Sequence, residues 1–76
     1  MNVKEIVYSC INKVVFVDDI EESNDLKEDL GLDSLSLVSV IVEIEDSCNI
    51  LFDDADLDPA GITSVYDLLK LTEKYV

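Results

Sequence analysis

Apolar residues recur at helical spacing in several parts of the chain. In the first part, from about residue 3 to residue 14, they lie three and four positions apart and therefore share one face of a helix. We expect a first helix over this range, with that face against the core. The residues of the face are Val3, Ile6, Val7, Cys10, Ile11 and Val14.

The segment after this helix, residues 15 to 30, has no sustained period and predicts a long ordered connection. We expect Phe16, Ile20, Leu26 and Leu30 to anchor it on the core, with one helical turn near Leu26. Gly31 suits the end of this connection, because glycine accepts backbone angles that other residues avoid.

A second helix is expected to begin at Asp33 or Ser34, which are both favourable N-cap residues, and to end at Asn49. It carries two apolar stripes side by side. The first stripe faces the core, and the second is either a docking strip at the surface or part of a wide core face. The first stripe contains Leu37, Val40, Ile41, Ile44 and Cys48, and the second contains Leu35, Val38 and Val42.

The rest of the chain predicts one short element and one helix. Residues 53–61, DDADLDPAG, are expected to form a short helix or turn that Pro59 and Gly61 end. A last helix is expected to begin at Thr63 or Ser64. The predicted fold class is an all-α bundle of three principal helices plus one short helix. The residues expected to point inward here are Ile50, Leu51, Phe52, Val65, Leu68, Leu69, Thr72 and Val76.

Charge is the feature of the composition that changes this picture most. The 76 residues suffice for a single domain, 1–76, and they include 18 acidic residues against 5 lysines, for a net charge of −13. Such a surface repels nucleic acid and favours partners with basic patches. No run is long enough to span a bilayer and no secretion signal is visible, so we expect a soluble, cytoplasmic monomer without membrane insertion.

The residue types present exclude several kinds of chemistry. There is no histidine, which removes the most common general base and the usual neutral metal ligand. Cys10 and Cys48 lie at apolar helical positions without a CxxC pattern, so we expect buried free thiols. A calcium loop beginning at Asp54 would lack both the glycine and the final glutamate that it requires. We expect neither a metal site nor an enzyme.

The stretch GLDSLSLVSV, residues 31 to 40, holds three serines. Ser36 and Ser39 fall inside the second helix, where serine commonly faces solvent or bonds to a carbonyl one turn earlier. Ser34 stands at the junction of loop and helix, where the free amides and the positive dipole favour a phosphate. From the residues alone, Ser34 is either a site that another enzyme modifies or, with Asp33, a helix cap.

The run DLGLDSLSL, residues 29 to 37, resembles the attachment motif of the acyl carrier and peptidyl carrier proteins, in which the serine of Asp-Ser-Leu receives phosphopantetheine. The resemblance covers nearly the whole chain, including the long loop before the motif, the short acidic segment and a last helix that opens with ITSVYDLL. It implies an acyl-carrier-like four-helix bundle with 4′-phosphopantetheine attached at Ser34.

The resemblance also implies roles for individual residues. Ser34 would carry the arm, whose thiol holds an acyl or aminoacyl group as a thioester. Asp33 would help to present Ser34 to the phosphopantetheinyl transferase, and Leu35 would give that enzyme an apolar contact. The transferase, a loading ligase and downstream synthase enzymes would share one recognition surface. That surface would consist of Leu35, Val38, Val42, Glu43, Glu45 and Asp46.

The implied function is an acyl carrier in a fatty acid, polyketide or specialised metabolite pathway, with an aminoacyl or peptidyl carrier, including a D-alanyl carrier, as the alternative. Fatty acid carriers usually have acidic residues in the first turns after the motif, where this chain has Ser36 and Ser39. A stand-alone carrier in a dedicated pathway is therefore favoured. A more distant alternative is an acidic protein-interaction module without a prosthetic group, which gives no reason for Asp-Ser-Leu at a helix start.

Repulsion among the acidic side chains predicts a response to divalent cations. At low ionic strength, millimolar magnesium is expected to raise the melting temperature, because weakly bound cations relieve the repulsion. Thermal unfolding with and without magnesium measures the effect, and an unchanged melting temperature would count against it.

Overall fold

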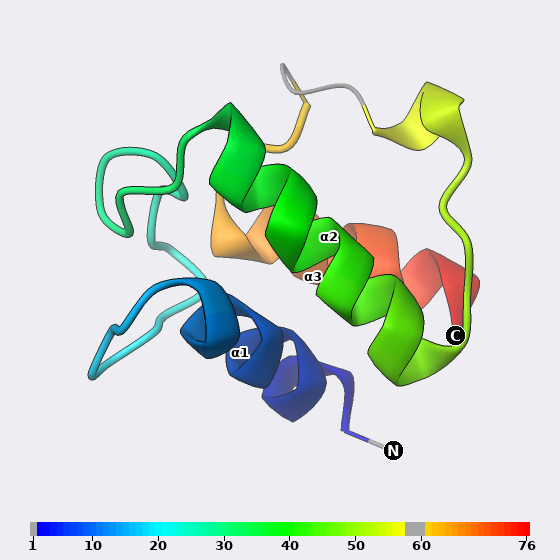
Figure 1. Ribbon diagram of the computed structural model, residues 1–76, viewed down its shortest axis with the longest axis horizontal. Coiled ribbons are helices and arrows are strands. Elements are labelled where there is room, and N and C mark those ends of the chain that lie inside the picture. Colours follow the sequence, from blue (N-terminus) through cyan, green and yellow to red (C-terminus); the bar gives the residue numbers. More distant parts are fainter. Residues whose placement is uncertain (1, 58–60) are drawn as a thin grey trace.

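The computed structural model describes residues 2–57 and 61–76 and is built from helices and loops (Figure 1). The prediction of an all-α fold is confirmed, and the short helix or turn expected within residues 53–61 includes a single 3₁₀ turn. Pro59, which was expected to end that element, lies outside the described residues. The elements are α1 (Val3–Val14), α2 (Ser34–Cys48), η1 (Asp54–Asp56) and α3 (Val65–Tyr75).

Helix α1 begins and ends where the apolar period predicted. The side chain of Asn2 caps its start by accepting a hydrogen bond from the Glu5 amide, at 3.3 Å. Val7, Cys10 and Ile11 are buried, and the outer members of the same stripe are half-buried against the core. The helix therefore contributes one narrow apolar face to the interior.

The connection between α1 and α2 is ordered by contacts to the start of α3. The Leu26 amide donates to the Thr63 carbonyl at 2.9 Å, and the Val65 amide donates to the Asn24 carbonyl at 3.0 Å. Leu26 and Leu30 are buried as expected, with a helical turn between them. Gly31 ends this turn with a φ of 70°, a left-handed conformation that favours glycine.

Three residues expected in the core lie at the surface instead. Phe16 is fully exposed and Leu51 is 82% exposed, while Val76 at the end of the chain is 54% exposed. Phe16 and Leu51 lie in non-helical segments, where neighbouring side chains point to opposite sides. The residues on either side of each take the inward positions: Val15 and Val17, and Ile50 and Phe52.

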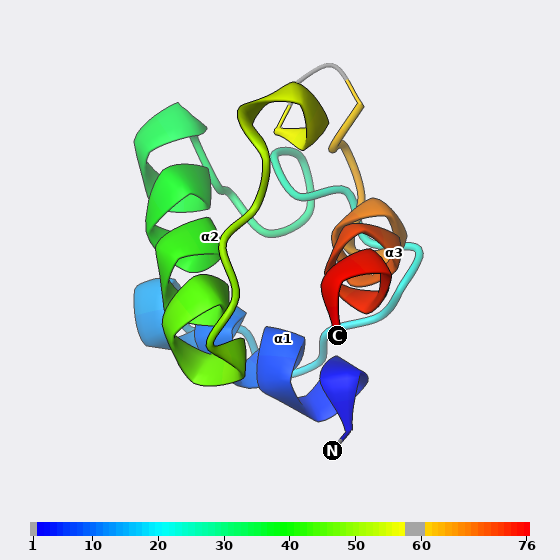
Figure 2. The same ribbon diagram turned by 90° about the vertical axis from the view of Figure 1, so that its right-hand side faces the viewer.

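Helix α1 packs against both α2 and α3, and the three helices surround a core that loop residues complete (Figure 2). The segment after α2 leaves that helix on the side of the C-terminal end of α3, and η1 lies next to the last turn of α3 (Figure 1). Side chains from the connecting segments thereby fill the space between α2 and α3. These buried residues are Leu26, Leu30, Leu32, Phe52 and Ile62.

Tyr75 ties η1 to the last turn of α3. Its hydroxyl donates to the Asp56 carboxylate and accepts from the Asp53 amide at 2.9 Å, while its ring meets Phe52 edge-on with centroids 5.0 Å apart. Lys74 adds an ion pair with Asp56 at 3.0 Å. The hydrogen bond from Tyr75 lowers the pKa of Asp56 and raises that of Tyr75 itself. The segment around η1 is therefore attached to the last turn of α3 by these contacts.

Removing the Tyr75 hydroxyl should loosen this attachment without disturbing the ring packing. Tyr75→Phe is expected to lower the melting temperature by a few degrees, because Asp56 and the Asp53 amide lose a partner. Tyr66→Phe is the matched control, since Tyr66 is 49% exposed. Equal melting temperatures for the two variants would contradict the assigned role.

Candidate functional site

Ser34 is the first residue of α2 and is exposed to solvent. Its position is set by Asp33, whose extended backbone makes it the N-cap of the helix. The Asp33 side chain accepts a hydrogen bond from the Ser36 amide at 2.8 Å, and the Asp33 carbonyl accepts from the Leu37 amide at 2.9 Å. The helix start that the sequence predicted is therefore confirmed, with Asp33 as the cap and Ser34 inside the first turn.

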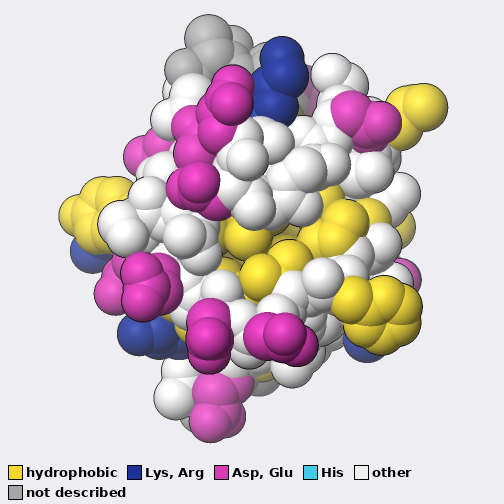
Figure 3. Space-filling view, turned by 90° about the vertical axis from the view of Figure 1, so that its left-hand side faces the viewer, with side chains coloured by type: hydrophobic (Ala, Val, Ile, Leu, Met, Phe, Trp, Pro, Cys, Tyr) yellow, Lys and Arg dark blue, Asp and Glu magenta, His cyan; other side chains and the backbone are white. Residues whose placement is uncertain are grey.

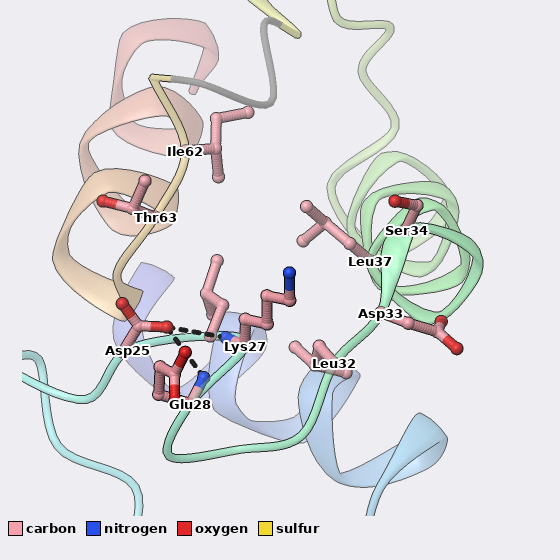
Figure 4. Close-up of a pocket in the computed structure, with 10 residues that line it drawn as sticks. Asp25, Lys27, Glu28, Leu32, Asp33, Ser34, Leu37, Ile62 and Thr63 are labelled. Atoms are coloured by element: carbon pink, nitrogen blue, oxygen red, sulfur yellow. Dashed lines mark hydrogen bonds between the residues drawn. The ribbon is translucent and has the colours of Figure 1, made fainter.

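The capping contact also controls the charge beside Ser34. The hydrogen bond from the Ser36 amide lowers the pKa of Asp33, so its carboxylate stays ionised to a more acidic pH than an ordinary aspartate does. That carboxylate is turned away from the cavity next to Ser34, whereas the Ser34 hydroxyl points toward the cavity (Figure 4). The two side chains therefore point in different directions: the Asp33 carboxylate caps the helix, and the Ser34 hydroxyl faces the cavity.

The other two serines of the motif region lie differently. Ser39 donates its hydroxyl to the Leu35 carbonyl at 3.2 Å, which is the local bond expected inside a helix. Ser36 is half-buried, and its amide is engaged by Asp33. Of the three serines, Ser34 alone combines exposure with a place in the first turn beside a cavity.

A cavity of about 420 Å³ opens beside Ser34, between the connection, the start of α2 and the segment before α3. Figure 4 shows Ile62 on the opposite side of the cavity from Leu37 and Ser34, next to Thr63, whose hydroxyl points away and donates to Asp67. We call it the first cavity. Its described lining residues are Asp25, Leu26, Lys27, Glu28, Leu32, Asp33, Ser34, Leu37, Ile62 and Thr63.

A second cavity, of about 240 Å³, lies along α2 and is mainly aliphatic. It shares Ser34, Leu37 and Ile62 with the first cavity, so the two meet next to the Ser34 hydroxyl. Glu45 borders its far end, and the Glu45 carboxylate is held there by the Phe52 amide at 2.9 Å. The described residues that line it are Ser34, Leu37, Val38, Ile41, Val42, Glu45, Leu57 and Ile62.

The second apolar stripe of α2 lies at the surface, so the wide core face is excluded. Leu35, Val38 and Val42 are 80%, 57% and 47% exposed. We call these three residues the exposed strip. Of the core stripe beside it, Val40, Ile41 and Ile44 are buried, whereas Leu37 and Cys48 are half-buried. An apolar strip of this kind is typical of a binding surface.

The three acidic residues expected around the strip have different surroundings. Asp46 is exposed, whereas Glu43 is half-buried and forms an ion pair with Lys13 of α1 at 3.3 Å. Glu45 is also half-buried and holds the backbone after α2. The contact of these residues with partner enzymes stays a prediction.

Acidic side chains dominate the face that Figure 3 presents, around a hollow whose floor is hydrophobic. The few basic side chains on this face lie apart from one another. Such a surface attracts basic partners through long-range electrostatics. Within the described part of the chain, no cluster of side chains is arranged to hold a metal ion, and no helix is long and apolar enough to cross a membrane.

Both cysteines are free thiols, one buried and the other half-buried. Cys10 is buried and lies 3.6 Å from the Ser47 hydroxyl, and Cys48 is half-buried. Burial raises the pKa of Cys48, which disfavours the reactive thiolate. The prediction of free thiols is confirmed, with Cys48 less buried than expected.

The sequence profile of the family described as "Phosphopantetheine attachment site" matches residues 5–71. An acyl carrier protein from Thermotoga maritima is 36% identical over 70 residues, covering 90% of this chain and 84% of the relative. One from Sulfurovum is 33% identical, covering 95% of this chain and 91% of the relative. A solved structure of a candidate acyl carrier protein from Mycobacterium tuberculosis superposes with a TM-score of 0.84 at 28% identity, covering 96% of this chain and 97% of that one.

The helical fold and these matches define a carrier domain with a phosphopantetheine attachment site. The chain belongs to the acyl carrier protein family. It follows that it is a carrier rather than an enzyme and that its cofactor is covalently attached 4′-phosphopantetheine. Members of this family interact with phosphopantetheinyl transferases and synthase enzymes.

The residues around Ser34 fit such a group. A serine hydroxyl that is exposed at a helix start accepts a bulky substituent without displacing core side chains. The free amides of the first turn favour the negative charge of a phosphodiester at this place. The adjoining cavities offer room for the arm and for an attached acyl group on either side.

Several cavity residues were not singled out from the sequence. Lys27, Leu32 and Ile62 come from segments without a helical period, and the chain brings them beside Ser34 only through its fold. The only local signal for Leu32 was its place in the motif run. The only signal for Ile62 was its place in the run ITSVYDLL, and neither spacing nor residue type distinguishes Lys27 from other loop residues.

The Asp33 cap predicts a pH-dependent stability difference. Asp33→Ala is expected to lower the melting temperature by a few degrees near neutral pH, and Asp33→Asn, which keeps the acceptor, by much less. The folded-state pKa of Asp33 lies below its usual value of about 3.9. The stabilisation is therefore complete above that pH and is lost as the pH falls through the lowered pKa.

The measurement is thermal unfolding of the wild-type protein and both variants from neutral pH down to a pH below the lowered pKa of Asp33. Comparing variants with the wild-type protein removes the general effect of titrating the other carboxylates. A difference between wild-type protein and Asp33→Ala that stays constant down to strongly acidic pH would contradict the ionised cap.

Proposed function

We propose that Ser34 carries the 4′-phosphopantetheine arm and that the protein delivers acyl groups, held as thioesters on the arm, to biosynthetic enzymes. One observation carries this proposal: the exposed Ser34 hydroxyl lies in the first turn of α2, where the first and second cavities meet. Asp-Ser-Leu at this position matches the attachment motif of the family that the chain belongs to.

Attachment requires a second protein. The Ser34 oxygen would form a bond to the β-phosphorus of coenzyme A, the bond to the adenosine bisphosphate portion would break, and that portion would leave. The serine proton would pass to a base of the transferase, since this chain has no histidine to take it. Asp33 would keep the hydroxyl presented by holding the helix start, and Leu35 would give the transferase an apolar contact.

Once attached, the arm supplies a thiol that forms the thioester with the cargo. The aliphatic lining of the second cavity supports an acyl cargo, because apolar side chains there shield a hydrocarbon chain from water. An aminoacyl or peptidyl cargo, including D-alanyl, is the alternative. The first turn of α2 contains no acidic residue, which supports a dedicated biosynthetic pathway over service to a fatty acid synthase.

The exposed strip would form the centre of the docking surface, with Asp46 at its edge and Glu43 and Glu45 beside it. Docking of a carrier must be brief, and electrostatic attraction to basic patches speeds encounter without requiring high affinity. We propose that the transferase, a loading ligase and the downstream enzymes use this surface in turn, in the cytoplasm, with the carrier as a monomer.

Attachment at Ser34 is tested by intact-mass measurement after incubation with coenzyme A and a broad-specificity phosphopantetheinyl transferase. The wild-type protein is expected to gain the mass of one arm, and Ser34→Ala is expected to gain none. Ser36→Ala and Ser39→Ala are the matched controls, because both serines lie within the next two turns of the same helix.

Both control variants should gain the arm as the wild-type protein does. Circular dichroism of Ser34→Ala establishes that a missing gain does not come from unfolding. A folded wild-type protein without any mass gain would overturn the proposal and would favour the acidic interaction module instead.

A further inference from the structure

Lys27 differs from the other lysines of the chain in having no ion-pair partner among the described residues. The chain contains 5 basic residues, all lysines, and the remaining four each lie close to a carboxylate. In a chain with a net charge of −13, carboxylates are abundant, so a lysine that pairs with none of the described ones is unusual. The four pairs are Lys4–Glu22 at 3.7 Å, Lys13–Glu43 at 3.3 Å, Lys70–Glu73 at 3.5 Å and Lys74–Asp56 at 3.0 Å.

The backbone of the connection holds Lys27 in place beside Ser34. The Asp25 carboxylate accepts from the amides of Lys27 and Glu28 at 2.9 and 2.8 Å, which fixes the turn from which the lysine side chain extends. That side chain reaches into the first cavity, and its ammonium group points toward the space between Leu37 and Ile62 (Figure 4). The ammonium group of Lys27 therefore lies at the cavity that borders Ser34.

The carboxylates near the cavity leave this charge available. Asp25 is engaged by two backbone amides, and the Asp33 carboxylate points away from the cavity (Figure 4). Glu28 also lines the cavity, but it forms no ion pair with Lys27. Of the described residues lining the first cavity, Lys27 is the one that can neutralise an anion.

We propose that Lys27 binds an anionic group that the arm on Ser34 brings to the first cavity. Two parts of the loaded arm can supply this chemistry: its phosphodiester, or a carboxylate at the free end of a dicarboxylic acyl cargo. The inference rests on the proposed attachment at Ser34. Lysine suits either source, because its flexible stem lets a compact charge follow an anion whose position is not fixed.

The physical need for such a contact comes from the field of the whole protein. An anion placed at Ser34 would be repelled by the surrounding acidic surface, although the start of α2 attracts it. The ammonium group of Lys27, which is exposed at this cavity, offsets that repulsion at short range, and added salt weakens the contact. The arm would then lie over the first cavity rather than extending freely into solvent.

The test compares the reactivity of individual lysines toward trace reductive methylation, quantified by peptide mass spectrometry. Four forms of the protein are used: without the arm, with the arm, and with the arm loaded with a monocarboxylic or a dicarboxylic acyl group of equal length. Methylation of Lys27 is expected to fall about threefold where the anion is bound, a factor typical of an ion pair of modest strength.

A fall on attachment of the arm alone identifies the phosphodiester, and a fall only with the dicarboxylic cargo identifies the carboxylate. Lys70 is the internal reference, because it lies on α3 in an exposed pair with Glu73 and should react equally in all four forms. Unchanged reactivity of Lys27 in every form would overturn the inference.

Lys27→Gln and Lys70→Gln give a second readout that is independent of lysine reactivity. If the phosphodiester is the anion, its ³¹P chemical shift should change in Lys27→Gln and stay the same in Lys70→Gln. Intact mass separates the two proposals. A normal gain of the arm with unchanged lysine reactivity overturns only the role of Lys27, whereas no gain in the wild-type protein overturns both.

Discussion

The hydrogen bond from the Ser36 amide to the Asp33 carboxylate is the interaction on which the site depends, because it makes Ser34 the first residue of α2. Burial of Val40 and Ile44 sets the rotation of the same helix about its axis. Since each residue advances an α-helix by about 100°, the start and the rotation together determine where the Ser34 hydroxyl points. The Asp33 cap and the buried stripe of α2 therefore together position the Ser34 hydroxyl.

Small size imposes the second constraint. Helix α1 packs on both α2 and α3, and loop side chains complete the interior between α2 and α3. Packing by loop residues leaves two cavities that meet beside Ser34. Because the small core has no room for every apolar residue of α2, the exposed strip lies outside it and gives an acidic protein an apolar surface. The cavities therefore follow from packing by loop residues, and the exposed strip follows from how α2 divides its apolar residues between the interior and the surface.

The helices could be predicted from the sequence, because their apolar residues repeat over three or more turns and their ends carry recognisable caps such as Asp33 and Ser64. The loops could be predicted only in part, since Leu26 and Leu30 are buried as expected whereas Phe16 and Leu51 are exposed. Phe16 and Leu51 each lie between two inward-facing neighbours, and three residues are too short a stretch to show which of them face the core. Ser34 was identifiable through its motif, whereas Lys27 reaches its place by tertiary structure alone.

The most direct test of the account is to locate the arm within the wild-type protein by fragmentation mass spectrometry after modification with coenzyme A. The account predicts that fragments containing Ser34 carry the added mass and that fragments beginning at Leu35 do not. An arm found on Ser36, on Ser39 or on any other residue would contradict the claim that the capped start of α2 presents the attachment site.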